Sequence, residues 1–161
     1  MKINGYGILA HVRFLSPLLG ILTGVWLLRL ALDAGGCPHY LSRFVSVTTT
    51  TTAMVFVAAL LIHFRGFGSY ANMIMASLLL TTWAQLLVIL AILFGVITGI
   101  ENIYTAPEYS FPKTDPYHLR HIYGHLTFGI GLTTLFGSAV GCLLLWVFRK
   151  LIPMRIRAEG H

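Results

Sequence analysis

Three histidines stand at positions 118, 121 and 125, near the start of the last apolar stretch of the chain. Their spacings of three and four residues would place His118, His121 and His125 on one face of an α-helix, within about 60° at about 100° per residue. Imidazole nitrogen is a good ligand for zinc, copper or iron, and two imidazoles one turn apart can share an ion. The pattern therefore predicts a candidate metal site, completed by Glu101 or Asp115 from neighbouring segments.

The same three histidines allow other interpretations. They could lie half in water at a membrane interface and bond to head groups, or form a docking surface for a partner subunit. A haem needs axial ligands that face each other from separate helices. His63 falls on the opposite side of the membrane from His121 and His125, which disfavours a shared iron. A pairing of His63 with His11 depends on the height of His11, which precedes the first apolar segment.

A quinone or lipid pocket is a further candidate for this region. Such a pocket needs an apolar slot near the interface and one or two hydrogen-bonding groups. His121, His125, Tyr123 and Arg120 could supply these groups above Phe128. A membrane-facing aromatic belt would account for the tyrosine equally well, so the nature of a cofactor, whether metal ion, haem or quinone, stays open.

The elements that must position these residues follow from the composition. The chain has 161 residues, of which 57% are hydrophobic and 10% charged, against roughly 25% charged in soluble domains. A membrane-spanning helix needs about 20 apolar residues. We predict an all-α fold, an integral membrane bundle of four helices that forms one domain over residues 1–161. The expected spans are about 14–32, 44–64, 73–100 and 122–148, with an outer loop at 101–115.

Local signals refine three of these elements. Pro17 falls in the first turn of the first span, where a missing N–H costs little. The second span contains five threonines, residues 48–52, whose hydroxyls can bond back to carbonyls one turn earlier. The last helix is predicted to begin at Pro116, with Thr114 or Asp115 as its cap.

The basic residues flanking the spans predict the orientation. The positive-inside tendency places the side richer in Lys and Arg, together with both termini, in the cytoplasm. We therefore expect a protein of a bacterial or archaeal cytoplasmic membrane. The richer side carries Lys2, Arg13, Arg65, Arg149, Lys150, Arg155 and Arg157, and the other side carries Arg29, Arg43, Lys113 and Arg120.

Small residues four apart predict where helices touch, within the chain or with a partner. These are Ser16, Gly20 and Gly24, then Gly95 and Gly99, then Gly137 and Gly141. No charged residue lies at the centre of a span, which argues against ion-coupled transport. Gln85 is the main polar group at depth and is expected to bond between helices. Hydrolase and nucleotide-binding motifs are absent, and basic residues form no patch suited to nucleic acid.

These features favour a small accessory or structural subunit of a larger inner-membrane complex of the respiratory or electron-transferring kind. Its expected partners are membrane lipid and other membrane-protein subunits, and it is not expected to be catalytic on its own. One alternative is a metal-, haem- or quinone-binding membrane redox protein that uses the outer histidine cluster. Another is a small membrane enzyme that acts on a lipid-like substrate.

Overall fold

Four long helices form most of the chain. The computed structural model describes residues 2–42, 44–106 and 115–152. Its four long helices are each long and apolar enough to cross a membrane, which confirms the prediction of an all-helical fold with four such helices. They are α1 (Ile8–Ala34), α3 (Val47–Phe64), α4 (Tyr70–Thr98) and a continuous last helix. That helix comprises α5 (Leu119–Gly124), the π-helical turn η1 (His125–Gly129) and α6 (Ile130–Leu151). The short elements are β1 (Lys2–Ile3), β2 (Tyr6–Gly7) and α2 (His39–Ser42).

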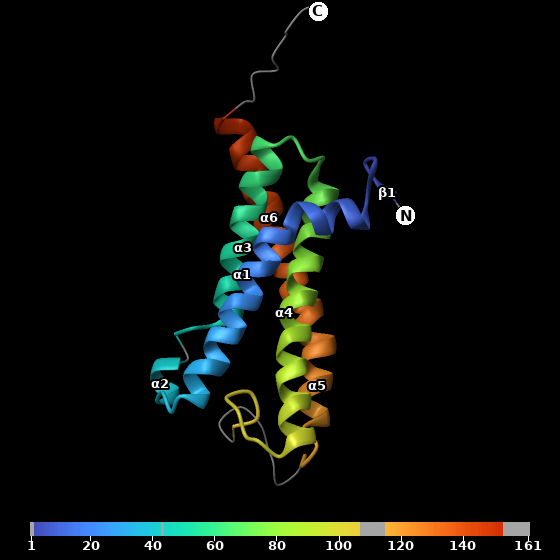
Figure 1. Ribbon diagram of the computed structural model, residues 1–161. Helices are drawn as coiled ribbons and strands as arrows, with labels where there is room; N and C mark the ends of the chain where they lie inside the picture. Colours follow the sequence, from blue (N-terminus) through green and yellow to red (C-terminus); the bar gives the residue numbers. More distant parts are fainter. Residues whose placement is uncertain (1, 43, 107–114, 153–161) are drawn as a thin grey trace, which may run out of the picture.

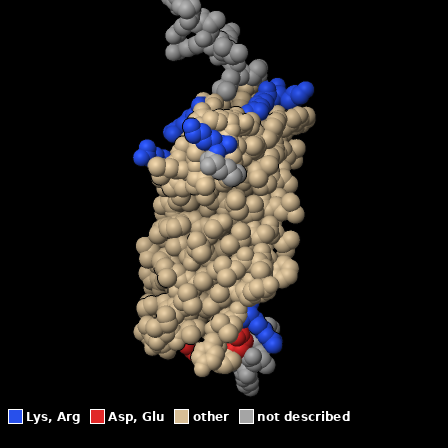
Figure 2. Space-filling view, turned by 90° about the vertical axis from the view of Figure 1, so that its right-hand side faces the viewer, with Lys and Arg blue, Asp and Glu red and all other residues tan. Residues whose placement is uncertain are grey.

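The long helices run alternately up and down, so the N-terminal hairpin and the end of α6 lie at the same end of the bundle (Figure 1). We call this the terminal end. The opposite end, with α2, residues 99–106 and the start of α5, is the loop end. Lys and Arg gather at the terminal end, and both signs of charge occur at the loop end (Figure 2). The face between them carries no charged side chain in this view.

The first helix is longer than predicted and contains its proline in the interior. It begins at Ile8, so Pro17 lies well inside α1 and not in its first turn. Proline has no N–H to donate to the carbonyl four residues earlier, which here belongs to Arg13. The Ser16 hydroxyl donates to that carbonyl instead, at 2.9 Å. The first turns of α1 lie across the bundle, and the remainder descends along it (Figure 1).

The N-terminal hairpin is held against the start of α4 by Asn72, which is fully buried. Asn4 and Gly5 have φ angles of 48° and 85° at the turn between β1 and β2, as a tight Asn-Gly hairpin turn requires. The side-chain oxygen of Asn72 accepts the Asn4 amide at 2.9 Å and the Ser69 N–H at 2.9 Å. One buried side chain therefore connects the hairpin to the cap of α4.

His11 completes this network and is a structural residue. Its Nδ1 donates to the Gly7 carbonyl at 2.9 Å, so its Nε2 accepts from the Asn72 amide at 3.1 Å. Neither ring nitrogen is left to bind a haem iron. His63 has a separate partner, because its Nε2 donates to the Ile152 carbonyl at 2.9 Å. His11 and His63 therefore form hydrogen bonds with different partners.

The threonine run behaves as predicted in the first turns of α3. Thr50, Thr51 and Thr52 donate their hydroxyls to the carbonyls four residues earlier, at 2.9, 2.7 and 3.2 Å. Ser46 caps the helix, with its hydroxyl oxygen accepting the Thr49 N–H at 3.3 Å. These bonds satisfy polar side chains that would otherwise face apolar surroundings unpaired.

Residues 99–106 fold back and close the loop end. The Asn102 amide donates to a carbonyl of α4 at 2.9 Å. The Ile103 N–H donates to the Asp33 carboxylate, near the end of α1, at 2.7 Å. The predicted outer loop is therefore packed on the bundle over its first part, and residues 107–114 lie outside the described chain.

The glycine pair of α6 lies at a contact with α3 and α4. A Cβ at Gly137 would lie 3.5 Å from Val55 and 3.6 Å from Ser77, whereas one at Gly141 would lie 2.5 Å from Met73. A Cβ at the second position would require the Met73 side chain to shift, so glycine permits the close approach of α6 to α4 as it stands.

We expect Asn72→Ala to destabilise the protein by about 3 kcal/mol, because buried donors and acceptors left unpaired cost about 1 to 3 kcal/mol each. The measurement is the free energy of unfolding, taken from reversible unfolding in mixed micelles. Thr52→Ala is the control, since the Thr52 hydroxyl is exposed and donates to a carbonyl of its own helix. Equal destabilisation by both substitutions would contradict the role of Asn72.

Candidate functional site

The last helix starts later than predicted, and this separates His118 from the other histidines. The helix begins at Leu119. The Asp115 carboxylate accepts the Leu119 N–H at 2.9 Å and the next N–H at 2.7 Å, so it satisfies two of the helix's first donors. Thr114, the other predicted cap, lies outside the described residues. His118 has a left-handed backbone with φ 51°, which removes it from the helical face that its spacing implied.

Two cavities divide the residues of the predicted metal site. His118 and Glu101 line a cavity of about 230 Å³, whereas His121 and His125 line another of about 330 Å³. Among the described residues, no three His, Cys, Asp or Glu side chains lie close enough to hold a metal ion. The predicted set is therefore not assembled in this part of the chain, because His118 precedes the helix.

His121, His125 and Gln85 form a hydrogen-bonded chain between the last helix and α4. The Nδ1 of His125 lies 2.5 Å from Oε1 of Gln85, and its Nε2 lies 3.1 Å from Nε2 of His121. An amide oxygen can only accept, so Nδ1 of His125 carries the proton and its Nε2 accepts from His121. In the neutral ring, the remaining Nδ1 of His121 is then an acceptor. It is buried without a partner among the described residues.

The π-helical turn η1 sets the direction of these imidazoles. At about 100° per residue, His121 and Gly137 would lie about 160° apart on an uninterrupted α-helix. A π-turn contains about one residue more than an α-helical turn. This extra residue reduces the angle between His121 and Gly137 by about 100°, to about 60°. Both residues can therefore face the bundle. The predicted face breaks at this turn, and Phe128 is 68% exposed.

Gly129, at the end of the π-turn, gives the Gln85 side chain its space. A Cβ at Gly129 would lie 2.8 Å from Oε1 of Gln85, the atom that accepts from His125. Any larger residue at this position would displace the amide. The glycine and the π-turn thus act together to admit the hydrogen-bonded chain.

The cavity beside His121 and His125 is formed by four parts of the chain. We call it the loop-end cavity. It lies between α1, the start of α3, α4 with the loop that follows it, and the last helix. Its lining residues are Arg29, Ser46, Val47, Thr48, Val88, Ile103, Tyr104, His121 and His125.

Three of the lining side chains carry a buried polar atom without a hydrogen-bond partner of normal geometry: Nε of Arg29, the hydroxyl of Tyr104 and Nδ1 of His121. The Arg29 guanidinium lies 4.9 Å from the centre of the Tyr104 ring. Burial raises the pKa of the Tyr104 hydroxyl, and the neighbouring Arg29 charge opposes this. Other such atoms, including the hydroxyls of Ser77 and Ser138, belong to residues that do not line the cavity. Buried polar atoms without partners are uncommon, and here three of them belong to one cavity.

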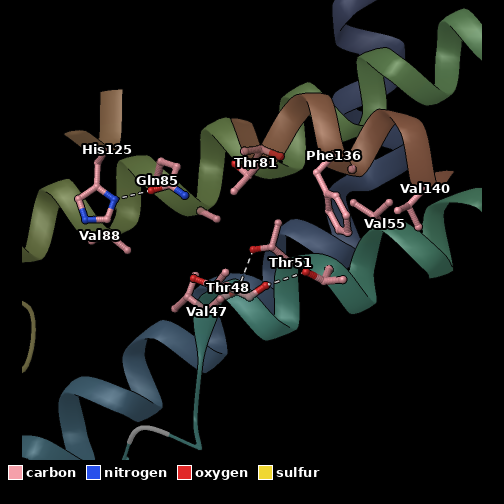
Figure 3. Close-up of a pocket in the computed structure, with 14 residues that line it drawn as sticks. Val47, Thr48, Thr51, Val55, Thr81, Gln85, Val88, His125, Phe136 and Val140 are labelled. Atoms are coloured by element: carbon pink, nitrogen blue, oxygen red, sulfur yellow. Dashed lines mark hydrogen bonds between the residues drawn. The ribbon is translucent and has the colours of Figure 1, made fainter. Parts of the chain in front are cut away.

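An apolar groove adjoins this cavity and runs between α3, α4 and α6 (Figure 3). We call it the threonine groove. His125 and Gln85 lie at one end of it, and Phe136, Val55 and Val140 lie toward the other (Figure 3). The cavity and the groove share the lining residues Val47, Thr48, Val88 and His125. Together they combine a polar compartment with an apolar one.

The structure brings together only part of the predicted cofactor site. His121 and His125 line the loop-end cavity, whereas Arg120, Tyr123 and Phe128 are exposed and line neither the cavity nor the groove. Sequence reasoning missed Arg29 and Tyr104. The signal for Arg29 is a cation within an apolar span, which the sequence interpretation above uses only for the orientation of the bundle.

Comparisons with known proteins leave the function to be argued from these residues. No protein-family model, curated protein or solved structure matches the chain.

We expect Gly129→Ala to break the hydrogen bond between Gln85 and His125, because the added Cβ would clash with the amide oxygen. The imidazole nitrogen resonances of His125 should then report a changed tautomer by NMR, with a stability loss of about 1 to 2 kcal/mol from overpacking. Gly131→Ala is the matched control, since a Cβ there meets nothing within 4 Å. An unchanged His125 spectrum in the Gly129→Ala variant would refute the assigned contact.

Proposed function

We propose that this chain is an integral membrane protein that binds an amphipathic small molecule at its loop end. The polar head lies in the loop-end cavity, and the apolar part lies in the threonine groove. The supporting observation is that three buried polar atoms without a hydrogen-bond partner of normal geometry belong to one cavity, which shares four lining residues with an apolar groove. Ligand sites typically combine a mostly apolar lining with a few convergent polar groups.

Several of the molecules considered from sequence fit this description. A quinone with an apolar tail and a membrane lipid both carry a polar head on an apolar chain. A metal or haem role has less support, because His125 is engaged through both nitrogens and His121 through one. We therefore assign the site to binding and propose no reaction.

The proposed placement has all four helices crossing a cytoplasmic membrane, with the terminal end in the cytoplasm. The described basic residues support this through the positive-inside tendency. Arg43, Lys113, Arg155 and Arg157 lie outside the described residues. Those at the terminal end are Lys2, Arg13, Arg65, Arg149 and Lys150, and those at the loop end are Arg29 and Arg120.

Cysteine labelling tests the orientation. Cys37 is a free thiol that follows α1 at the loop end. A membrane-impermeant maleimide should therefore label it on intact cells. In a Cys37→Ser background, Arg13→Cys at the terminal end should be labelled only after the cells are opened. The reverse pattern would overturn the proposed orientation.

Photolabelling tests the ligand site. A photoreactive analogue of dodecanol should label residues of the threonine groove, such as Thr48 or Phe136. Val140→Phe should fill the groove and reduce affinity about tenfold, which corresponds to about 1.4 kcal/mol. Leu143→Phe is the control, because Leu143 is 60% exposed and does not line the groove. If the two variants are labelled equally, the groove is not the binding site.

An accessory role in a larger respiratory or electron-transferring complex is the second candidate. α1 exposes Ser16, Gly20 and Gly24 on one face. A Cβ at Gly20 or Gly24 would meet nothing within 4 Å, unlike one at Gly137 or Gly141 of α6. Small residues allow a helix of another subunit to approach closely. Isolation of the chain from its native membrane as a monomer without a companion subunit would contradict this role.

A further inference from the structure

We infer that the loop-end cavity recognises a phosphate monoester carried on an apolar chain. This inference rests on the proposed function and specifies the head group of its ligand.

The lining of the cavity carries a positive charge and no acidic residue. It includes Arg29 but no Asp or Glu, and Nε of that guanidinium is buried without a hydrogen-bond partner in the described chain. Two carboxylates lie nearby and accept backbone N–H groups, Asp33 from Ile103 and Asp115 from the start of α5. A partly buried guanidinium favours an anion, and its geometry suits the oxygens of a carboxylate or a phosphate.

The donors around the cavity outnumber the oxygens of a carboxylate. Besides Arg29, the lining contains the hydroxyls of Ser46, Thr48 and Tyr104. The Ser46 oxygen already accepts the Thr49 N–H, so its proton remains available to donate. Tyr104 is only 7% exposed and its hydroxyl has no partner of normal geometry. These donors come from α1, the start of α3 and the loop after α4. Three terminal oxygens of a phosphate monoester match this spread better than two carboxylate oxygens.

His121 is compatible with a phosphate monoester head. In the neutral ring, the chain through His125 to Gln85 makes Nδ1 of His121 an acceptor, so a ligand group that bonds to this form of the ring donates a proton. A phosphate monoester has a second pKa near 6 and retains that proton on a fraction of molecules at neutral pH. An ionised carboxylate, a quinone carbonyl and a phosphodiester have no such proton to donate.

The loop-end cavity is large enough for the head group. The cavity of about 330 Å³ holds a phosphate with several waters, since one water occupies about 30 Å³ in the liquid. The threonine groove shares Val47, Thr48 and Val88 with it and offers the apolar surface on which an alkyl chain can lie.

The test compares three probes on the full chain in nanodiscs of zwitterionic lipid. The probes are dodecyl phosphate, dodecanol and inorganic phosphate, with binding followed by native mass spectrometry. Wild type should bind dodecyl phosphate more tightly than dodecanol. Arg29→Gln should lower the affinity for dodecyl phosphate at least about tenfold, as expected for a lost charge-assisted contact. It should leave the affinity for dodecanol unchanged.

Arg120→Gln is the matched control, since Arg120 is an exposed arginine at the same end that does not line the cavity. It should change binding by less than about twofold. Thr48→Val keeps the side-chain shape and removes one hydroxyl, so it tests the site even if Arg29→Gln fails to fold. This substitution should lower the affinity for dodecyl phosphate about threefold, which is within the range for the loss of one hydrogen bond.

Each outcome separates the phosphate inference from the proposed function. If dodecyl phosphate binds no more tightly than dodecanol and neither Arg29→Gln nor Thr48→Val matters, the phosphate inference fails and amphiphile binding stands. If inorganic phosphate binds as tightly as dodecyl phosphate, the phosphate site stands and the amphipathic ligand fails. If no probe binds, both fail.

Discussion

Polar groups inside an apolar bundle have no water to bond, so each must find a partner within the chain or carry a free-energy cost. The carbonyl left by Pro17 bonds to Ser16, and the threonines of α3 bond back along their own helix. Asn72 uses its side-chain amide and oxygen in one network. Around the loop-end cavity, Arg29, Tyr104 and His121 each keep a buried polar atom without a hydrogen-bond partner of normal geometry. Other such atoms, including the hydroxyls of Ser77 and Ser138, belong to residues that do not line this cavity, so it is the grouping of three around one space that favours a binding site.

The helical part of the fold could be predicted because apolar length alone specifies it. Four stretches of sufficient length gave four helices, and the threonine run was correctly placed in α3. The start of α1 was missed because Pro17 was assumed to mark a first turn. The interior position is tolerated because a serine hydroxyl replaces the missing donor, and that compensation depends on local geometry that composition does not reveal.

The candidate site was only partly predictable, for two reasons. Residue spacing was converted into angle on the assumption of an uninterrupted α-helix, whereas the chain begins its helix after His118 and then passes through a π-turn. Each of these two features turns the histidine side chains away from the direction that an uninterrupted α-helix would give them. Arg29 and Tyr104 were missed because they come from α1 and from the loop after α4, and their meeting with His121 is a property of tertiary packing.

The contact between His11 and Asn72 also constrains the order in which the structure can form. Residues 2–11 leave the ribosome long before Asn72 has been translated, since 61 positions separate the two contacting side chains. Until α3 is complete and α4 has begun, the hairpin has no surface on which to settle. The hairpin therefore reaches its final position only after a segment made 61 residues later, and it closes the terminal end when the third long helix arrives.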